Sequence, residues 1–127
     1  MTIIPLPWDA PPITQNGLRR MHHMAEASAK RCALLEARSA IRATNGLGFM
    51  AGAVVILNWR MPDKRRRDGD GAAPTLKVCL DALVKEGVLH DDSWVEVPHS
   101  GITVHPPIPK QPGAMWLAVS PVPEESS

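Results

Sequence analysis

Residues 50–59 read Met-Ala-Gly-Ala-Val-Val-Ile-Leu-Asn-Trp, and this stretch decides the fold. Its centre, 54–57, is a continuous apolar run rich in β-branched residues, which favour strands, and Pro62 ends it. Because the apolar residues do not alternate with polar ones, we expect a strand that is buried on both faces. Such a strand predicts a sheet at the centre of the domain.

Helical patterns lie on both sides of this strand. Residues 19–44 contain neither Pro nor Gly and carry an apolar stripe with steps of three and seven residues, so one long helix is expected there. Its stripe consists of Met24, Ala27, Leu34 and Ile41. A second helix is expected to begin at Pro74, which suits a first turn, and to end at Gly87. Its stripe consists of Leu76, Leu80 and Leu83.

Three more segments read as strands and complete the sheet. They are Thr2–Trp8, an edge candidate interrupted by prolines, Trp94–Val104, and Ala114–Val119. The order β-α-β-α-β-β predicts a single α/β (α+β) domain over residues 1–120, with a mixed sheet flanked by helices. Residues 121–127 are polar and are expected to form a flexible C-terminal tail.

The segments between these elements are expected to be loops, in particular 9–17 and the charged segment 63–73. His22-His23 has no acid or cysteine at an obvious ligand spacing and is expected to face solvent. His90 is expected to be a loop histidine, with contact to DNA as the alternative. Trp94 and Trp116 are expected to be core residues of their strands.

The composition predicts a single globular domain and argues against two classes of protein. The chain has 127 residues, of which 44% are hydrophobic, enough for one domain with its own core. Cys32 and Cys79 form no Cys-x-x-Cys pair, so a structural zinc site is not expected, and both should be buried free thiols. Four Trp, one Phe and no Tyr argue against a reader of single strands that stacks bases on aromatic side chains.

The apolar segments give no sign of a membrane protein. Residues 1–8 lack the basic start of a secretory signal and contain two prolines, and the apolar segment 47–57 is too short to span a bilayer. We therefore expect a soluble cytoplasmic protein with no membrane partner.

Acidic residues gather at two places on either side of the second expected helix. Asp68 and Asp70 are separated by Gly69, and in an extended segment both carboxylates would point to the same side. Asp91-Asp92 follows the helix, and the fold could return it to the first pair. Magnesium prefers oxygen ligands of this kind, whereas the simpler interpretation is that Asp-Gly and Asp-Asp stand in solvated turns.

Basic residues surround the first acidic pair. The run 64–67, Lys-Arg-Arg-Arg, directly precedes it and could contact phosphate oxygens; alternatively it is a solvated basic loop. Lys77 lies off the apolar stripe of the second helix, four residues before Asp81. It is either an exposed ion pair worth under about 1 kcal/mol or a cation that stabilises a phosphoryl transition state.

These motifs together resemble those of the RusA family of Holliday junction resolvases, found mainly in phages and prophages. The resemblance is most specific in residues 61–95 and looser elsewhere. Its motifs are Met61–Asp70 (MPDKRRRDGD), Lys77-x-x-x-Asp81-Ala82-Leu83, Gly87–Asp92 (GVLHDD), and the opening Leu6-Pro7-Trp8 with Pro11-Pro12 and Asn16.

The resemblance implies roles for individual residues. The metal ligands would be Asp68, Asp70 and Asp92, and Lys77 would complete the catalytic set. It selects Asp92 over Asp91 as the third carboxylate. It implies a DNA contact for Arg67, and the basic run adds Lys64, Arg65 and Arg66 as expected phosphate contacts. Asn16 of the opening motif is also expected to contact DNA.

The implied activity is a Mg²⁺-dependent endodeoxyribonuclease, with Mn²⁺ as the alternative cation. It would act as a homodimer that resolves four-way junctions and other branched DNA by symmetric nicking, in DNA recombination and repair. Its place would be the cytoplasm of a bacterial host that carries the phage or prophage.

One departure from the family pattern supports a competing hypothesis. Gly71 stands where the family usually has asparagine after the second aspartate, so an amide that would support the metal site is missing. A module that binds branched DNA without cutting it is therefore the alternative. A third interpretation is a structural protein whose basic loop binds a protein partner.

Overall fold

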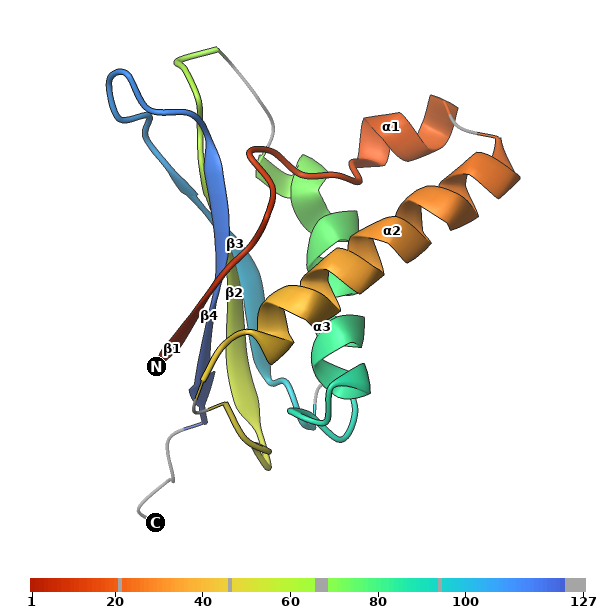
Figure 1. The fold of residues 1–127 in the computed structure, drawn as a ribbon, viewed down its shortest axis with the longest axis vertical. Coiled ribbons are helices and arrows are strands. Elements are labelled where there is room, and N and C mark those ends of the chain that lie inside the picture. Colours follow the sequence, from red (N-terminus) through yellow and green to blue (C-terminus); the bar gives the residue numbers. More distant parts are fainter. Residues whose placement is uncertain (21, 46, 66–68, 94, 123–127) are drawn as a thin grey trace.

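The computed structural model describes residues 1–20, 22–45, 47–65, 69–93 and 95–122, and of Gly69 and Asp70 it describes the backbone only. These residues form one small α+β domain with a four-stranded mixed sheet (Figure 1). The elements in chain order are β1 (Thr2–Pro5), α1 (Gln15–Arg20), α2 (His23–Arg42), β2 (Ala53–Arg60), the short 3₁₀ helix η1 (Gly69–Ala72), α3 (Ala73–Lys85), β3 (His99–His105) and β4 (Ala114–Pro121).

The sheet has the order β1-β4-β2-β3, so the strand first identified in the sequence is an inner strand. β2 pairs in parallel with β3 and antiparallel with β4, and β1 pairs antiparallel with the outer side of β4. Leu57 lies opposite Leu117 on one side and Ile102 on the other. The predicted mixed sheet and the edge position of the first strand are confirmed.

The expectation that β2 is buried on both faces is wrong. Ala53, Val55 and Leu57 are fully buried, whereas Val54 and Ile56 are half-buried. The reason is that α2 and α3 lie on the same side of the sheet, as Figure 1 shows. A continuous apolar run does not by itself reveal how many faces the helices cover.

The single long helix predicted over 19–44 is divided in two, and α1 begins inside the expected loop 9–17. His22 has an extended backbone, with φ −64° and ψ 145°, and its Nδ1 accepts a hydrogen bond from the Met24 amide. His22 is therefore the N-cap of α2, a local contact that the helical periodicity does not reveal.

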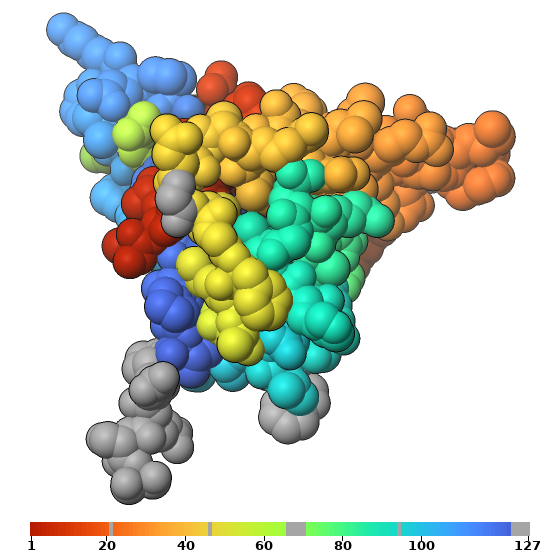
Figure 2. Space-filling view, turned by 60° about the horizontal axis from the view of Figure 1, so that its bottom comes forward, coloured from red at the N-terminus to blue at the C-terminus, as the bar shows by residue number. Residues whose placement is uncertain are grey.

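Only the C-terminal half of α2 contributes buried residues to the core. Its buried residues are Ala33, Ala37 and Ile41, all in its C-terminal half, whereas Met24 of the predicted stripe is 69% exposed. Figure 2 shows the N-terminal half of α2 projecting beyond α3 and the sheet. The first turns of α2 therefore present side chains to solvent on most sides.

The second helix agrees well with its prediction. α3 has Pro74 in its first turn and ends just before Gly87, whose φ of +78° suits glycine. The segment 63–73, expected to be a loop, contains η1, which leads into α3 without an intervening residue. The buried residues of α3 are Thr75, Val78, Cys79, Leu80, Ala82 and Leu83.

Several smaller expectations need correction. β3 begins at His99 instead of Trp94, and Trp94 itself lies outside the described residues. Trp116 is half-buried on the sheet face away from the helices, where it stacks on His105 with ring centroids 5.0 Å apart. Cys79 is buried, as expected, but Cys32 is exposed.

The C-terminal strand is longer than predicted. β4 continues to Pro121, and the Val122 amide donates to the Gly52 carbonyl at 3.1 Å, so the first two residues of the expected tail lie at the sheet. Residues 123–127 lie outside the described residues. Within the described chain, every helix is too short or too polar to cross a membrane.

Candidate functional site

The contact between Lys77 and Asp92 forms the centre of the candidate site. Lys77 Nζ donates to Asp92 Oδ2 at 2.5 Å, although the two residues are fifteen positions apart. Lys77 also lies 3.9 Å from Asp81 Oδ1, the i+4 contact predicted from the helical spacing. Two of the four residues implied to be catalytic are therefore in direct contact.

The backbone around Asp92 explains its orientation. Asp91 Oδ1 accepts hydrogen bonds from the amides of Asp92, at 2.7 Å, and Ser93, at 3.3 Å. This is the local turn that aspartate favours. Asp91 thus shapes the loop, while Asp92 reaches across to α3, and the two neighbouring acids have different tasks.

The same contact sets the charge of both groups. The hydrogen bond from Lys77 lowers the pKa of Asp92 below its ordinary value, and the contribution of that bond outweighs desolvation, which acts in the opposite direction. The hydrogen bond to Asp92 raises the pKa of Lys77. At neutral pH Asp92 is a carboxylate and Lys77 a cation, so Lys77 is suited to stabilise an anion and not to accept a proton.

The acidic segment is connected to this pair through the start of α3. η1 carries the backbone of Asp70 and runs directly into the helix that presents Lys77. Asp68, Arg66 and Arg67 lie outside the described residues, and the side chain of Asp70 is not described. The predicted convergence of three carboxylates therefore stays a prediction.

The described side chains include only part of the set of carboxylates that would bind a metal ion. The described side chains include no group of three His, Cys, Asp or Glu residues that could hold a metal ion. Asp92 contributes one carboxylate, which its contact with Lys77 keeps ionised. A hard cation fits here if Asp68 and Asp70 supply the remaining oxygens.

A buried threonine, which the sequence analysis did not identify, ties the N-terminal segment to this helix. Thr75 is fully buried; its Oγ1 donates to the Ile13 carbonyl at 2.6 Å and accepts from the Ile13 amide at 3.3 Å. This clamp holds the chain three residues before Asn16, which is exposed on α1. The sequence signal for it is a polar residue on the apolar face of a helix, four residues before Cys79.

The described part of the basic run lies at the surface. Lys64 and Arg65 are exposed. Asp63 Oδ1 accepts from the Arg65 amide at 2.9 Å, and Asp63 Oδ2 lies 4.0 Å from Arg65 Nε. The loop is thus partly neutralised by its own acid, and Lys64 adds an exposed positive charge beside it.

The remaining candidates are peripheral. His22 and His23 are exposed, with ring centroids 4.3 Å apart, and His90 is exposed in the loop before Asp91, all as expected. A Cβ atom at Gly71 would meet no atom within 4 Å, so the local backbone does not itself require glycine there.

Comparison with known proteins adds no relative to this description. No family model matches the chain, and a search of curated proteins gives no significant match.

Proposed function

We propose that the protein is a Mg²⁺-dependent, structure-selective DNA endonuclease that resolves four-way junctions and other branched DNA by symmetric nicking. The observation that carries this proposal is the contact between Lys77 and Asp92. These residues belong to two separate motifs of the RusA resemblance, and the fold brings them together beside the helix that follows the acidic loop. A chance ion pair at the surface would not be expected to join one residue from each of these two motifs.

The charges of this pair suit cleavage of a phosphodiester. Asp92 would be one of three carboxylates that hold the cation, with Asp68 and Asp70. A bound Mg²⁺ supplies an activated water, an oriented phosphate and neutralisation of developing charge. Lys77, kept protonated by Asp92, would stabilise the negative charge that accumulates on the phosphate oxygens.

The surrounding surface would grip the DNA backbone. Lys64 and Arg65 are exposed on the loop that leads into the acidic segment, and Arg66 and Arg67 continue the same run. Asn16 is exposed on α1, three residues after Ile13, which Thr75 holds at the start of α3. Such contacts to phosphates position a substrate without reading its sequence.

The proposed enzyme acts as a homodimer. Symmetric nicking of a four-way junction requires two equivalent sites, and a two-fold pair of subunits supplies them on a substrate with matching pseudo-symmetry.

The experiment compares Asp92→Asn with the neighbouring Asp91→Asn on a synthetic four-way junction. With Mg²⁺, Asp92→Asn should lower the nicking rate by at least about a hundredfold, because the variant loses a charged ligand. Asp91→Asn should cut at nearly the wild-type rate, since asparagine still accepts the two backbone hydrogen bonds. Nicking of opposed strands at equal rates checks the symmetry.

Three outcomes would overturn the proposal in different ways. Full cleavage by Asp92→Asn would remove the residue from the metal site. Tight junction binding by the wild type without nicking in Mg²⁺ or Mn²⁺ would favour the non-cleaving module. Junction binding that is absent or independent of salt would favour a protein partner for the basic loop.

A further inference from the structure

The sheet has two outer strands, β1 and β3, and their free edges differ. In β1, the Leu6 amide donates to the Met115 carbonyl at 3.1 Å, so Leu6 and every second residue before it face β4. The backbone groups of Ile3 and Pro5 therefore point outward. Because Pro5 has no N–H group, this edge is protected against pairing with another chain.

The free edge of β3 has no such protection. The His105 carbonyl accepts from the Met61 amide at 3.1 Å, so His105 and every second residue before it face β2. The backbone groups of Ser100, Ile102 and Val104 point outward, and the described residues offer them no hydrogen-bond partner. All seven residues of β3 pair with β2 without a bulge, and none of them is Pro, Asp, Glu, Lys or Arg.

Exposed apolar side chains accompany this edge. Val104 is 44% exposed, and just beyond the two ends of the strand Val95 is 62% and Ile108 is 42% exposed. A long strand edge with unpaired backbone groups and exposed apolar side chains is a template for pairing with another strand.

The strand is complementary to a second copy of itself. Ile102 is the midpoint of β3, and its backbone points outward. In an antiparallel pair centred on Ile102, Ser100 would face the partner's Val104, and each facing pair would exchange its backbone hydrogen bonds. The end with Val95 would lie beside the partner's end with Ile108. No like-charged Asp, Glu, Lys or Arg side chains would meet, whereas a charged strand of another protein would find no opposite charge on β3.

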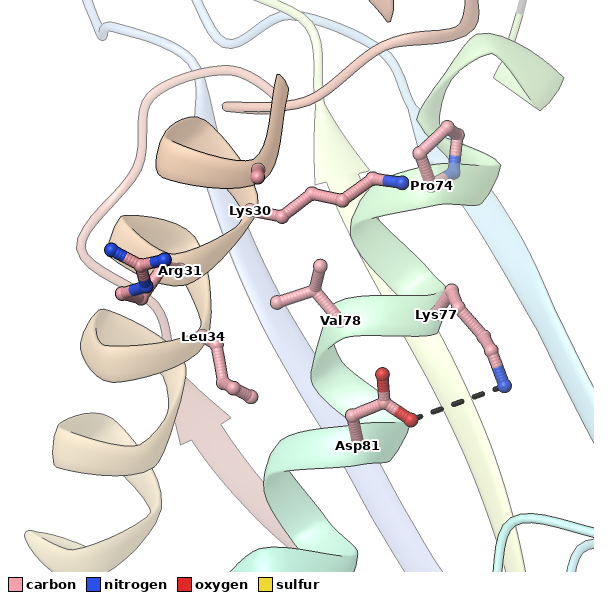
Figure 3. A pocket seen from close by; sticks show the side chains of 8 residues that line it. Lys30, Arg31, Leu34, Pro74, Lys77, Val78 and Asp81 are labelled. Atoms are coloured by element: carbon pink, nitrogen blue, oxygen red, sulfur yellow. Dashed lines mark ion pairs between the residues drawn. The ribbon is translucent and has the colours of Figure 1, made fainter. Parts of the chain in front are cut away.

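The candidate site lies on the side of α3 that is close to this edge. β3 contacts both α3 and η1, which carries the backbone of Asp70. Figure 3 shows the Lys77 ammonium on the side of α3 away from Leu34 and Val78, which line a groove between α2 and α3. Residues that face each other in an antiparallel pair lie on one face of a sheet, so the helices of both copies would lie on the same side of the joined sheet. Two equivalent sites would then face one substrate.

We infer that the free edge of β3 is the interface between two copies of this chain, which pair antiparallel with Ile102 on the two-fold axis. This inference rests on the proposed function, which requires two equivalent sites, and deepens it by naming the surface that joins them. The joined sheet fixes the separation of the two sites, as symmetric nicking of opposed strands requires.

Disulfide cross-linking tests the register of the two strands. Cys32→Ser first removes the exposed thiol. In that background Ile102→Cys should form a covalent dimer under mild oxidation, because facing Cα atoms in a hydrogen-bonded antiparallel pair lie about 5.5 Å apart. Val104→Cys is the matched control on the same edge, since it would lie roughly 14 Å along the strand from its own copy. Chains with Val104→Cys should instead link to chains with Ser100→Cys.

A charge variant tests the interface without a cross-link. Ser100→Lys/Val104→Lys would place lysines opposite each other and should raise the dissociation constant of the dimer at least about tenfold, measured by analytical ultracentrifugation without DNA. Met24→Lys/Leu35→Lys adds the same charge at exposed positions of α2 and should change this constant less than about twofold. Thermal unfolding of both variants checks that they fold.

The outcomes separate the interface from the proposed function. A dimer that links through Ile102→Cys but does not nick junctions would keep the interface and overturn the nuclease. A chain that nicks junctions but links equally well through Val104→Cys would overturn the interface and keep the nuclease. A wild type that is monomeric both alone and on the junction would overturn the inference and leave the edge of β3 to a strand of another protein.

Discussion

The two long helices lie on the same face of the sheet but are held to it very differently. α3 has 13 residues, of which six are buried, whereas α2 has 20 residues with only three buried. α3 is also fixed near both ends, by Thr75 at Ile13 and by Glu86 at Arg38 and Arg42. The first half of α2 has no comparable anchor among the described residues.

Under the proposed function, this difference would suit the two helices to separate tasks. A charged group that must hold a defined geometry is best placed on a rigid element, and Lys77 stands on α3. In the proposed enzyme, the projecting half of α2, which carries Lys30 and Arg31, would provide a surface that adapts to the substrate. Substitutions on α3 should therefore cost much more stability than similar ones on α2.

The largest effect is expected for truncation in the core side of α3. Leu83 is fully buried, so Leu83→Ala should lower the free energy of unfolding by about 3 kcal/mol. Leu35 of α2 is 53% exposed, and Leu35→Ala should change it by less than about 0.5 kcal/mol. Urea denaturation measures both. Equal losses would show that α2 is anchored more firmly than its burial indicates.

The next effect tests the clamp at the start of α3. Thr75→Val keeps the shape of the side chain but leaves the amide and carbonyl of Ile13 without their partner, which should cost about 2 kcal/mol. Thr103 is exposed on β3, and Thr103→Val should be nearly neutral. If Thr75→Val proved equally neutral, the N-terminal segment would not depend on α3 for its position.

A smaller effect is expected where the end of α2 meets α3. The Glu86 carboxylate is 10% exposed and contacts Arg38 Nε at 2.7 Å and Arg42 Nε at 3.2 Å. Glu86→Gln should cost about 1 kcal/mol, since the arginines are partly exposed and solvent screens them. Glu36 is exposed on α2, the helix that carries both arginines, so Glu36→Gln is the control. A loss that did not shrink in high salt would contradict an electrostatic origin.

The sequence predicted the elements with strong apolar patterns better than the features that depend on individual contacts or on tertiary packing. α3 and the inner strand carry strong periodic or continuous apolar patterns, and their type and position were predicted well. The start of α2 is capped by a hydrogen bond from the Met24 amide to His22, a contact that a pattern of apolar residues does not contain. The open face of β2 depends on where the helices pack, and that is a tertiary property.

The candidate site shows the same limit. The contact between Lys77 and Asp81 follows from helical spacing. The contact with Asp92 crosses fifteen residues and was not predicted. The sequence suggested only that Asp91-Asp92 could return to the first acidic pair, and the family resemblance placed Lys77 and Asp92 in one catalytic set. Thr75 was missed because both of its hydrogen bonds go to a residue 62 positions away. The groove was missed because its two sides come from different helices.

The smallest expected effect is the pH dependence of the Lys77–Asp92 pair. Because the pKa of Asp92 is lowered below 3.8, its stabilisation is complete above that value and is lost as the pH falls through the lowered pKa. Because the pKa of Lys77 is raised above 10.5, its stabilisation is complete below that value and is lost as the pH rises through the raised pKa. The pair should therefore stabilise the fold between about pH 4 and pH 10 by well under 1 kcal/mol, since Lys77 is 64% exposed.

The measurement of this effect is the difference in unfolding free energy between wild type and Asp92→Asn across the acid range, with Asp91→Asn as the control. The difference should vanish near pH 2 and reach its plateau by about pH 5. A difference independent of pH would mean that Asp92 stabilises the loop through its shape and not through its charge. In that case Asp92 would not act as the charged partner that holds the Lys77 ammonium. The position of Lys77 on the rigid helix α3 would then not be enough to explain the geometry of the Lys77–Asp92 contact.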